Sequence, residues 1–216
     1  MIPQKVNKED KNMKLTWLGH ACFLLESGGC RVILDPCKGV PGVKDTAGEA
    51  DAVYCSHGHF DHCYTDELSI RENAPSPFTA SEIASFHDDA SGAKRGENTI
   101  RALTAEGITV VHLGDLGHPL SEEQVAEIGK CDVLLIPVGG TYTLDICAAK
   151  QVAQQVNPRV IVPMHYRRGE MGFEVLQTVE EFTAQYDAQS VHYLTENTVE
   201  LTEELLTRGG VVVPQV

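Results

Sequence analysis

The sequence predicts an α/β fold in which sheets pack as a sandwich and helices cover them. The first half contains short apolar runs separated by glycine and proline, which is typical of strands joined by turns. The second half alternates such runs with segments of helical periodicity. Several apolar runs end in polar segments rich in histidine and aspartate, so chemically active loops are expected at the strand ends. The 216 residues, 42% of them hydrophobic, are enough to build one sizeable core.

The first half is predicted to consist mainly of strands. Apolar runs that read as strands lie at 14–19, 22–27, 31–36 and 52–56. Residues 65–72 are predicted to form a brief helix. Further strand-like runs follow at 82–89, 99–107 and 108–115, and the last two meet at a turn formed by Glu106 and Gly107.

The second half is predicted to alternate helix and strand. Helices are predicted from caps and periodicity: one that begins at Ser121 and ends at Gly129, one over 143–156, and one that begins at Thr178. Buried strands are predicted at 133–137 and 160–166. Residues 191–201 are expected to form a hairpin-like pair of strands.

The charge of the chain argues against polyanionic partners. The formal net charge is −14, and the basic clusters at 93–96 and 166–169 are short. A surface of this kind repels nucleic acid and anionic membranes. We interpret the basic clusters as local anion contacts or solvated loop charges. We therefore expect a small-molecule substrate, no nucleic-acid partner and no membrane partner, while the oligomeric state is left open.

Targeting and linker signals predict a cytoplasmic protein with a single domain. The sequence has no apolar run of about 18 residues, the length that a membrane span requires. Its N-terminus lacks the apolar segment of a secretory signal. Residues 1–12 are polar and precede a second methionine, so they are predicted to be a disordered extension. Residues 13–216 contain no linker and no low-complexity segment, and they are predicted to form one domain.

The seven cysteines are predicted to be reduced. Their number is odd, the chain is not small and secretion is not indicated, so a disulfide framework is not expected. Most are interpreted as small buried residues. Cys55 and Cys63, which flank a histidine cluster, are interpreted as structural.

The segment SHGHFDHC, residues 56–63, carries the strongest chemical signal. It places His57, His59, Asp61 and His62 directly after a predicted strand. Imidazole and carboxylate are costly to bury without partners, whereas both are common zinc ligands. His57 and His59 are two residues apart and project to the same side of extended backbone, so they can hold one ion. Asp61 and His62 follow a turn and can serve a second ion.

Further ligands are expected at other strand ends. The remaining candidates are His20, His87, His112, Asp115, His118, His165 and His192. Three of them, His87, Asp115 and His165, follow strand-like runs. Active-site groups of α/β proteins gather at this position, so these three are preferred.

The pattern H-x-H-x-D-H at 57–62 resembles that of the metallo-β-lactamase fold superfamily. Within it, the sequence looks like the predicted metal-dependent hydrolases that include ascorbate-6-phosphate lactonases and N-acyl-phosphatidylethanolamine phospholipases. The supporting segments are WLGHACF (17–23), VILDP (32–36), HLGDLGH (112–118), DVLLIPVGGTYTLD (132–145) and PMHY (163–166). The resemblance extends over residues 14–202 and implies a four-layer αββα sandwich, the metallo-β-lactamase fold.

The resemblance also implies a dinuclear metal site. Its ligands would be His57, His59 and His87 for the first ion, Asp61, His62 and His165 for the second, and Asp115 as the bridge. Asp35 would not bind a metal ion itself but would orient the histidine loop that carries the ligands. The interval between His62 and His87 is short for the superfamily, so His112 is the alternative third histidine. His87 is preferred because His112 and Asp115 look like one motif whose aspartate is the ligand.

The implied function is hydrolysis assisted by two divalent ions. Zinc is the preferred metal, with Mn²⁺, Fe²⁺ or Ni²⁺ as alternatives. A hydroxide that bridges the two metals would attack a small ester, lactone or phosphodiester, with Asp61 and Asp115 in the catalytic centre. The alternatives are a non-catalytic metal-binding or sensing protein and a nuclease of the same fold. A flavodi-iron redox protein is disfavoured because it would have glutamate in place of His59.

Other polar residues are expected to support the ligands or to line the pocket. These are Asp35, His20, His112, Tyr142 and Tyr166. The two tyrosines are interpreted as substrate-facing hydroxyls or as core residues. Asp88 and Asp89 either orient His87 or are solvated. Gly139 and Gly140 either offer backbone N–H groups to an anion or form a tight turn.

Overall fold

The computed structural model describes residues 13–71 and 75–215. The strands are β1 (Lys14–Gly19), β2 (Cys22–Ser27), β3 (Cys30–Leu34), β4 (Gly48–Ala50), β5 (Ala52–Tyr54), β6 (Leu68–Ile70), β7 (Thr79–Phe86), β8 (Glu97–Ala105), β9 (Ile108–His112), β10 (Val133–Pro137), β11 (Val160–Met164), β12 (Val191–Tyr193), β13 (Thr198–Glu200) and β14 (Gly210–Val213). The helices are α1 (Glu122–Ile128), α2 (Ile146–Val156), α3 (Val179–Thr183) and α4 (Glu203–Arg208), with a 3₁₀ helix, η2 (Ala188–Ser190). The predicted N-terminal extension, residues 1–12, lies outside the described residues.

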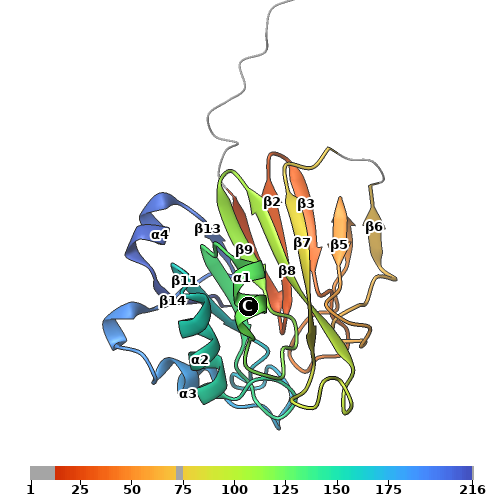
Figure 1. Cartoon of the computed structure of the whole chain (residues 1–216). Coiled ribbons are helices and arrows are strands. Elements are labelled where there is room, and N and C mark those ends of the chain that lie inside the picture. Colours follow the sequence, from red (N-terminus) through yellow and green to blue (C-terminus); the bar gives the residue numbers. More distant parts are fainter. Residues whose placement is uncertain (1–12, 72–74, 216) are drawn as a thin grey trace, which may run out of the picture.

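Two mixed sheets pack face to face, as Figure 1 shows. The smaller sheet has the strand order β13-β1-β2-β3-β5, and the larger has the order β12-β14-β11-β10-β9-β8-β7. In the larger sheet β9, β10, β11, β14 and β12 are parallel neighbours, whereas β7 and β8 pair in antiparallel fashion. Helices α1 and α2 lie against the larger sheet (Figure 1). The predicted metallo-β-lactamase fold is confirmed.

The core lies between the two sheets. Trp17 and Phe23 of the smaller sheet and Leu103 and Val110 of the larger sheet are fully buried in it. A second, smaller cluster covers the outer face of the smaller sheet and contains the residues Cys22, Leu24, Ile33, Cys37, Val40 and Ala50. The outer layer on this side is therefore supplied partly by the loop after β3 and by the short β4-β6 sheet.

The helices begin at the caps that the sequence predicts. Ser121 and Thr178 form capping boxes at the starts of α1 and α3. Helix α2 begins later than predicted, at Ile146, because the side chain of Asp145 accepts the Ala148 N–H and caps it. None of the helices in the described part of the chain is long and apolar enough to cross a membrane.

Two predicted elements are wrong. The described residues of 65–72 form a turn and then β6, which pairs with β4 in parallel. Residues 191–201 do not form a hairpin. Their first part is β12, which joins the larger sheet, and their last part is β13, which joins the smaller sheet. This segment therefore crosses from one sheet to the other.

The strand ends that carry the predicted ligands meet at one edge of the sandwich. His57 follows β5 in the smaller sheet, while Asp115 and His165 follow β9 and β11 in the larger sheet. The backbone N–H of His165 donates to the carbonyl of His20, 3.1 Å away, and thereby links the ends of β11 and β1. Both sheets thus contribute to the same site.

Candidate metal centre

The first group of candidate ligands comprises His57, His59 and His87. One donor atom of each lies within 4.8 Å of the donor atoms of the other two. The Nδ1 atom of His57 is 2.9 Å from the hydroxyl oxygen of Ser56, which leaves its Nε2 for an ion. The structure therefore brings together the three histidines that were predicted for the first metal.

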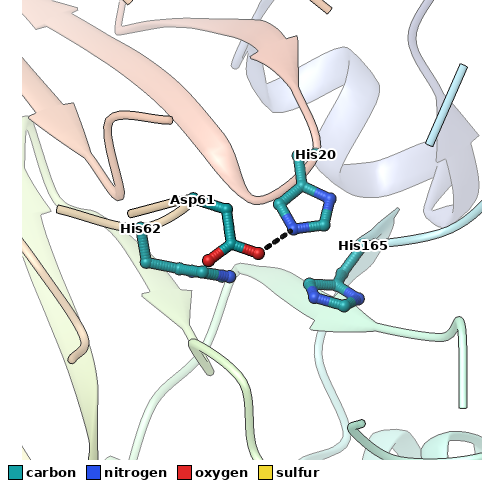
Figure 2. A group of neighbouring side chains, drawn as sticks. All are labelled: His20, Asp61, His62 and His165. Carbon is teal, nitrogen blue, oxygen red and sulfur yellow. Dashed lines mark ion pairs between the residues drawn. The ribbon is translucent and has the colours of Figure 1, made fainter. Parts of the chain in front are cut away.

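The second group comprises His20, Asp61, His62 and His165 (Figure 2). The donor atoms of these four residues also lie within 4.8 Å of one another. Nε2 of His20 is 3.4 Å from Oδ2 of Asp61, and the rings of His20 and His165 have centroids 4.0 Å apart. The predicted trio for the second metal is brought together. His20, which was predicted only to line the pocket or to make a structural hydrogen bond, is added to it.

Asp115 lies between the two groups. Its Oδ2 atom is 3.1 Å from Nε2 of His87, 3.2 Å from Nε2 of His62 and 3.2 Å from Nε2 of His165. The backbone N–H of Asp115 donates to Oδ1 of Asn98, 2.9 Å away, and this bond holds the loop after β9 in place. One buried carboxylate oxygen therefore faces imidazoles from both groups, which is the placement expected of a bridge.

Asp35 supports the histidine loop as predicted. Its Oδ2 atom is 2.7 Å from Nδ1 of His62, and it also accepts the hydroxyl of Ser56 at 2.6 Å. Its Oδ1 atom accepts the backbone N–H of Ser56 at 2.7 Å. A carboxylate on one ring nitrogen fixes the tautomer of the imidazole and directs the other nitrogen to the metal. Asp35 therefore directs Nε2 of His62 toward Asp115.

His112 does not belong to either group. Its Nε2 atom is 2.9 Å from the carbonyl oxygen of Ala21, and its Nδ1 accepts the backbone N–H of Gly114 at 3.0 Å. The ring is buried and both nitrogens have partners in the backbone. His112 therefore fixes backbone near the site, whereas His87 faces Asp115.

Burial keeps His20 and His57 neutral, whereas nearby imidazoles keep the carboxylates of the site charged. Burial lowers the pKa of His57 to about 4 and that of His20 to about 3, so both rings have a free lone pair at neutral pH. Burial also favours the neutral form of His62, but the carboxylates of Asp115 and Asp35 raise its pKa well above the usual value. Burial alone would raise the pKa of Asp61, but the nearby His20 ring and the charge of His62 hold it at about 2. Burial likewise opposes ionisation of Asp115, yet His165 and His62 hold its pKa well below the usual range.

Several buried polar atoms of the site have no hydrogen-bond partner among the described residues. They are Nδ1 and Nε2 of His20, Nε2 of His57, Nε2 of His62, Nδ1 of His87, Nδ1 of His165 and Oδ1 of Asp115. Such atoms are rare in folded proteins because each one carries a desolvation cost. Imidazole nitrogen and carboxylate oxygen are the donors that zinc and related divalent ions prefer. The donor set therefore fits a pair of divalent metal ions.

A pocket of about 610 Å³ opens above the cluster. His59, His87, Asp115 and His165 contribute to its polar part. Its other walls include the aromatic side chains Phe60, Tyr142 and Phe173. Phe60 is 60% exposed and Tyr142 is 40% exposed, so they stand at the mouth of the pocket. Tyr142 therefore lies where a substrate-facing residue was predicted.

Tyr166 lies elsewhere. It is buried in the core, where its ring centroid is 5.3 Å from that of Trp17, and it does not line the pocket. The core interpretation therefore holds for this tyrosine. Gly139 is explained by close packing as well, because a Cβ atom at this position would collide with the carbonyl oxygen of His165.

The loop that carries the histidine cluster is closed by a disulfide bond between Cys55 and Cys63. The prediction of reduced cysteines is wrong for this pair. The loop turns back through two hydrogen bonds to the carbonyl of His59, from the N–H groups of His62 at 3.0 Å and of Cys63 at 2.9 Å. This turn brings the two cysteine Cα atoms within 5.3 Å, which suits a disulfide. The sequence shows that these two cysteines flank the cluster, but the odd number of cysteines argued against disulfide bonds.

The backbone is left-handed at three residues of the site. The φ angles are 54° at His20, 45° at Asp35 and 52° at His165. Side chains other than glycine rarely adopt this conformation, and it costs free energy unless the surroundings enforce it. The surrounding structure therefore keeps these three residues in a backbone conformation that residues with side chains disfavour.

Asp88 organises the loop that follows His87. Its carboxylate accepts four backbone N–H groups, from Ala90, Gly92, Lys94 and Arg95, at 2.7 to 3.0 Å. Burial opposes ionisation, but these four donors hold the pKa of Asp88 at about 2. Asp88 was predicted either to orient His87 or to be solvated, and the structure shows a third role for it, as the centre of its loop.

Sequence reasoning missed several residues around the site. Ser56 connects Asp35 to His57, and Asn98 holds the backbone of Asp115. Phe60 and Phe173 line the pocket, although nothing in their local sequence distinguishes them from core residues. Of the pocket residues that were missed, only Arg95 gave a signal, through the basic segment 93–96, which was interpreted as an anion contact or a solvated charge.

Comparison with known proteins identifies relatives that match most of the chain. A family model described as the beta-lactamase superfamily domain matches residues 14–165. A protein of Archaeoglobus fulgidus named UPF0173 metal-dependent hydrolase is 33% identical over 193 residues, covering 71% of this chain and 83% of the relative. A protein of Carboxydothermus hydrogenoformans with the same name is 31% identical over 196 residues, covering 71% of this chain and 84% of the relative.

A crystal structure from Thermotoga maritima, described as a candidate zinc-dependent hydrolase of the metallo-β-lactamase superfamily, is also similar. It is 38% identical in sequence, has a TM-score of 0.75, and the match covers 94% of this chain and 98% of that chain. The chain belongs to the metallo-β-lactamase superfamily and, within it, to the UPF0173 metal-dependent hydrolase family.

Proposed function

We propose that this protein is a hydrolase that uses two divalent metal ions, preferably zinc, to cleave a small ester, lactone or phosphodiester. One observation carries the proposal: a single oxygen of Asp115 lies within 3.2 Å of His87 from the first group and of His62 and His165 from the second. The names of the relatives, which describe metal-dependent hydrolases, support the same reaction class.

In this proposal each group of side chains holds one ion. His57, His59 and His87 would hold the first ion, Asp61, His62 and His165 would hold the second, and Asp115 would serve both. His20 lies against Asp61 and holds its carboxylate in place. When bound, the two ions would lower the pKa of a water molecule to around 7 and would polarise the carbonyl or phosphoryl oxygen of the substrate.

The remaining residues orient the ligands and shape the pocket. Asp35 keeps the His62 tautomer that leaves Nε2 available. Asp61 has a pKa of about 2, so it is better suited to hold an ion than to accept a proton near neutral pH. Phe60, Tyr142 and Phe173 provide apolar walls that can hold the body of a small substrate and displace water from it.

The test combines metal analysis with a hydrolysis screen. Purified protein is analysed for zinc, manganese, iron and nickel, and is then assayed on an ester, a lactone, an amide and a phosphodiester. We expect close to two ions per chain and turnover of one bond type. A metal content that never exceeds one ion per chain after addition of metal would contradict the dinuclear centre.

Two variants make the screen specific. Asp115→Ala removes the carboxylate between the two groups and is expected to abolish turnover while the far-UV circular dichroism spectrum is retained. Asp89→Ala removes an exposed carboxylate of the neighbouring loop and is expected to leave turnover unchanged. Two bound ions without turnover of any bond type would instead favour a metal-binding or sensing protein, and cleavage of nucleic acid alone would favour a nuclease.

A further inference from the structure

The pocket above the metal-binding residues contains an arginine. Of the described residues that line this pocket, Arg95 is the only lysine or arginine. It lies in the loop between β7 and β8, eight positions after His87, and its side chain is exposed. The pocket therefore combines a cluster of metal-binding donors, aromatic walls and one permanent cation.

The backbone of Arg95 is fixed by its loop. Its N–H donates to Oδ2 of Asp88, 2.7 Å away. The base of the loop is closed by a hydrogen bond of 3.1 Å from the N–H of His87 to the carbonyl of Gly96. Because Asp88 directly follows His87, one compact loop positions both a candidate metal ligand and Arg95.

The side chain of Arg95 is held against the opposite wall. Nη2 donates to the carbonyl oxygen of Thr141 at 3.0 Å, and Cζ lies 5.5 Å from the centroid of the Tyr142 ring. A guanidinium group has five N–H donors in a planar fork, so the bond to Thr141 leaves donors for another acceptor. Stacking on an aromatic ring limits the rotation of the group and leaves its edge available.

Arg95 has no acidic partner in the part of the chain that the structure describes. Carboxylates lie within 4.0 Å of Lys94, Arg101, Arg159 and Arg168, among other cations, but not of Arg95. Arg167 and Arg208 also lack such a pair among the described residues, but neither of them lines this pocket. An exposed guanidinium that faces a pocket without a carboxylate partner can serve a ligand.

We infer that Arg95 binds an anionic group of the substrate, a carboxylate or a phosphate, while the scissile bond lies at the metal-binding residues. The substrate class is then a small molecule with a hydrolysable bond, an apolar body that fits between Phe60, Tyr142 and Phe173, and an anionic end. This inference rests on the proposed function for the position of the scissile bond, but the anion site itself requires no catalysis.

The test is a calorimetric titration that involves no turnover. Zinc-loaded protein is titrated with butyrate, succinate and 3-phosphonopropionate, which share a carboxylate that can reach the metal and differ at the other end. On the wild-type protein, succinate or 3-phosphonopropionate should bind about 10-fold or more tightly than butyrate, because only their second anion can meet the guanidinium. The tighter of the two shows whether the anion is a carboxylate or a phosphate.

Variants separate recognition of the anion from a structural role. Arg95→Gln keeps a donor for Thr141 but removes the charge, and it should bring the affinities for all three acids within about 2-fold of one another. Lys94→Ala removes a cation of the same loop whose amino group binds Asp89 outside the pocket, and it should keep the wild-type preference. Equal affinities on the wild-type protein, no measurable binding of any acid, or a preference that survives Arg95→Gln would each overturn the inference.

This design distinguishes failure of the inference from failure of the proposed function. If the hydrolysis screen finds no activity but the preference for a second anion depends on Arg95, the anion site stands and the hydrolase proposal falls. If hydrolysis is found and Arg95→Gln changes neither the binding preference nor KM for a substrate with an anionic end, the hydrolase stands and the anion site falls. If the protein takes up no zinc, succinate binding that Arg95→Gln weakens still supports the anion site.

Discussion

His87 and His112 show how two buried histidines near one site acquire different roles. Both nitrogens of His112 are bound by backbone groups, the carbonyl of Ala21 and the N–H of Gly114. His87 instead presents Nε2 to Asp115 at 3.1 Å. An imidazole that already makes two hydrogen bonds cannot bind an ion without losing one of them, so only His87 is free to do so.

Substitution of each histidine by alanine distinguishes these roles. His87→Ala should empty the first metal site, because a site of three imidazoles loses one ligand. His112→Ala should keep two ions per chain and should instead lower the stability of the protein, because it leaves a buried carbonyl without its donor. Metal analysis and thermal unfolding of both variants test this, and the converse result would show that ligand and supporting residue have been exchanged.

At the residue scale, the sequence predicted most of the chemistry but not its surroundings. His57, His59, Asp61 and His62 were recognisable because four potential ligands follow one strand. His20 was assigned only a supporting or pocket role, because its place beside Asp61 depends on how the turn after β1 packs against the loop after β5, which is distant in the sequence. Contacts that are set by packing between distant segments leave no local pattern in the sequence.

At the scale of elements, the loop between β5 and β6 depends on a covalent link. The disulfide between Cys55 and Cys63 encloses the candidate ligands that the histidine cluster contributes. A cross-link of this kind restricts the conformations that the loop can adopt without its metal, and typical disulfides contribute about 2–4 kcal/mol of stability. The bond therefore holds these ligands close together before an ion arrives.

The double substitution of Cys55 and Cys63 by serine should loosen this loop. We expect the variant to remain folded, because the core residues are unchanged, and to lose metal to a chelator several-fold faster than the wild-type protein. Cys147→Ser, which removes an exposed thiol that forms no disulfide, is the control and should behave as wild type. Equal rates of metal release would show that the disulfide is not needed for the geometry of the ligands.

Strands and caps were the most predictable elements of the fold. The apolar runs that became β2, β10 and β11 are almost entirely buried, and β1 is buried on one face; hydrophobic periodicity detects burial of both kinds. Residues 191–201 read as a hairpin because two short strands follow each other. Their partners are instead β14 and β1, each supplied by another part of the chain, and no feature inside the segment specifies those partners.

At the scale of the whole molecule, the candidate metal ligands come from both sheets. His57 and Asp61 lie after a strand of the smaller sheet, whereas His87, Asp115 and His165 lie after strands of the larger one. Ions bound by both sets would link the sheets at one edge of the sandwich. Binding to the folded state alone stabilises it by mass action.

Metal removal should therefore lower the melting temperature. At a free zinc concentration 100 times Kd, one site contributes about 2.7 kcal/mol, which corresponds to a shift of roughly 5–10 °C for a chain of this size. Thermal unfolding of metal-free protein with increasing zinc should show a steep rise up to two equivalents, followed by a slower rise with the logarithm of the free zinc concentration. Asp115→Ala should reduce this rise, because it faces both groups, whereas a rise of equal size in that variant would argue against a shared bridge.

The left-handed backbone at His20, Asp35 and His165 has an evolutionary consequence. Each such conformation costs on the order of 1–3 kcal/mol for a residue with a side chain, and glycine adopts it most easily. Selection for thermal stability alone would therefore favour glycine at all three positions. An imidazole or a carboxylate at these positions therefore lowers the stability of the fold but supplies a polar group to the site. Engineering this chain for heat resistance should therefore leave these three positions untouched and seek its gains elsewhere.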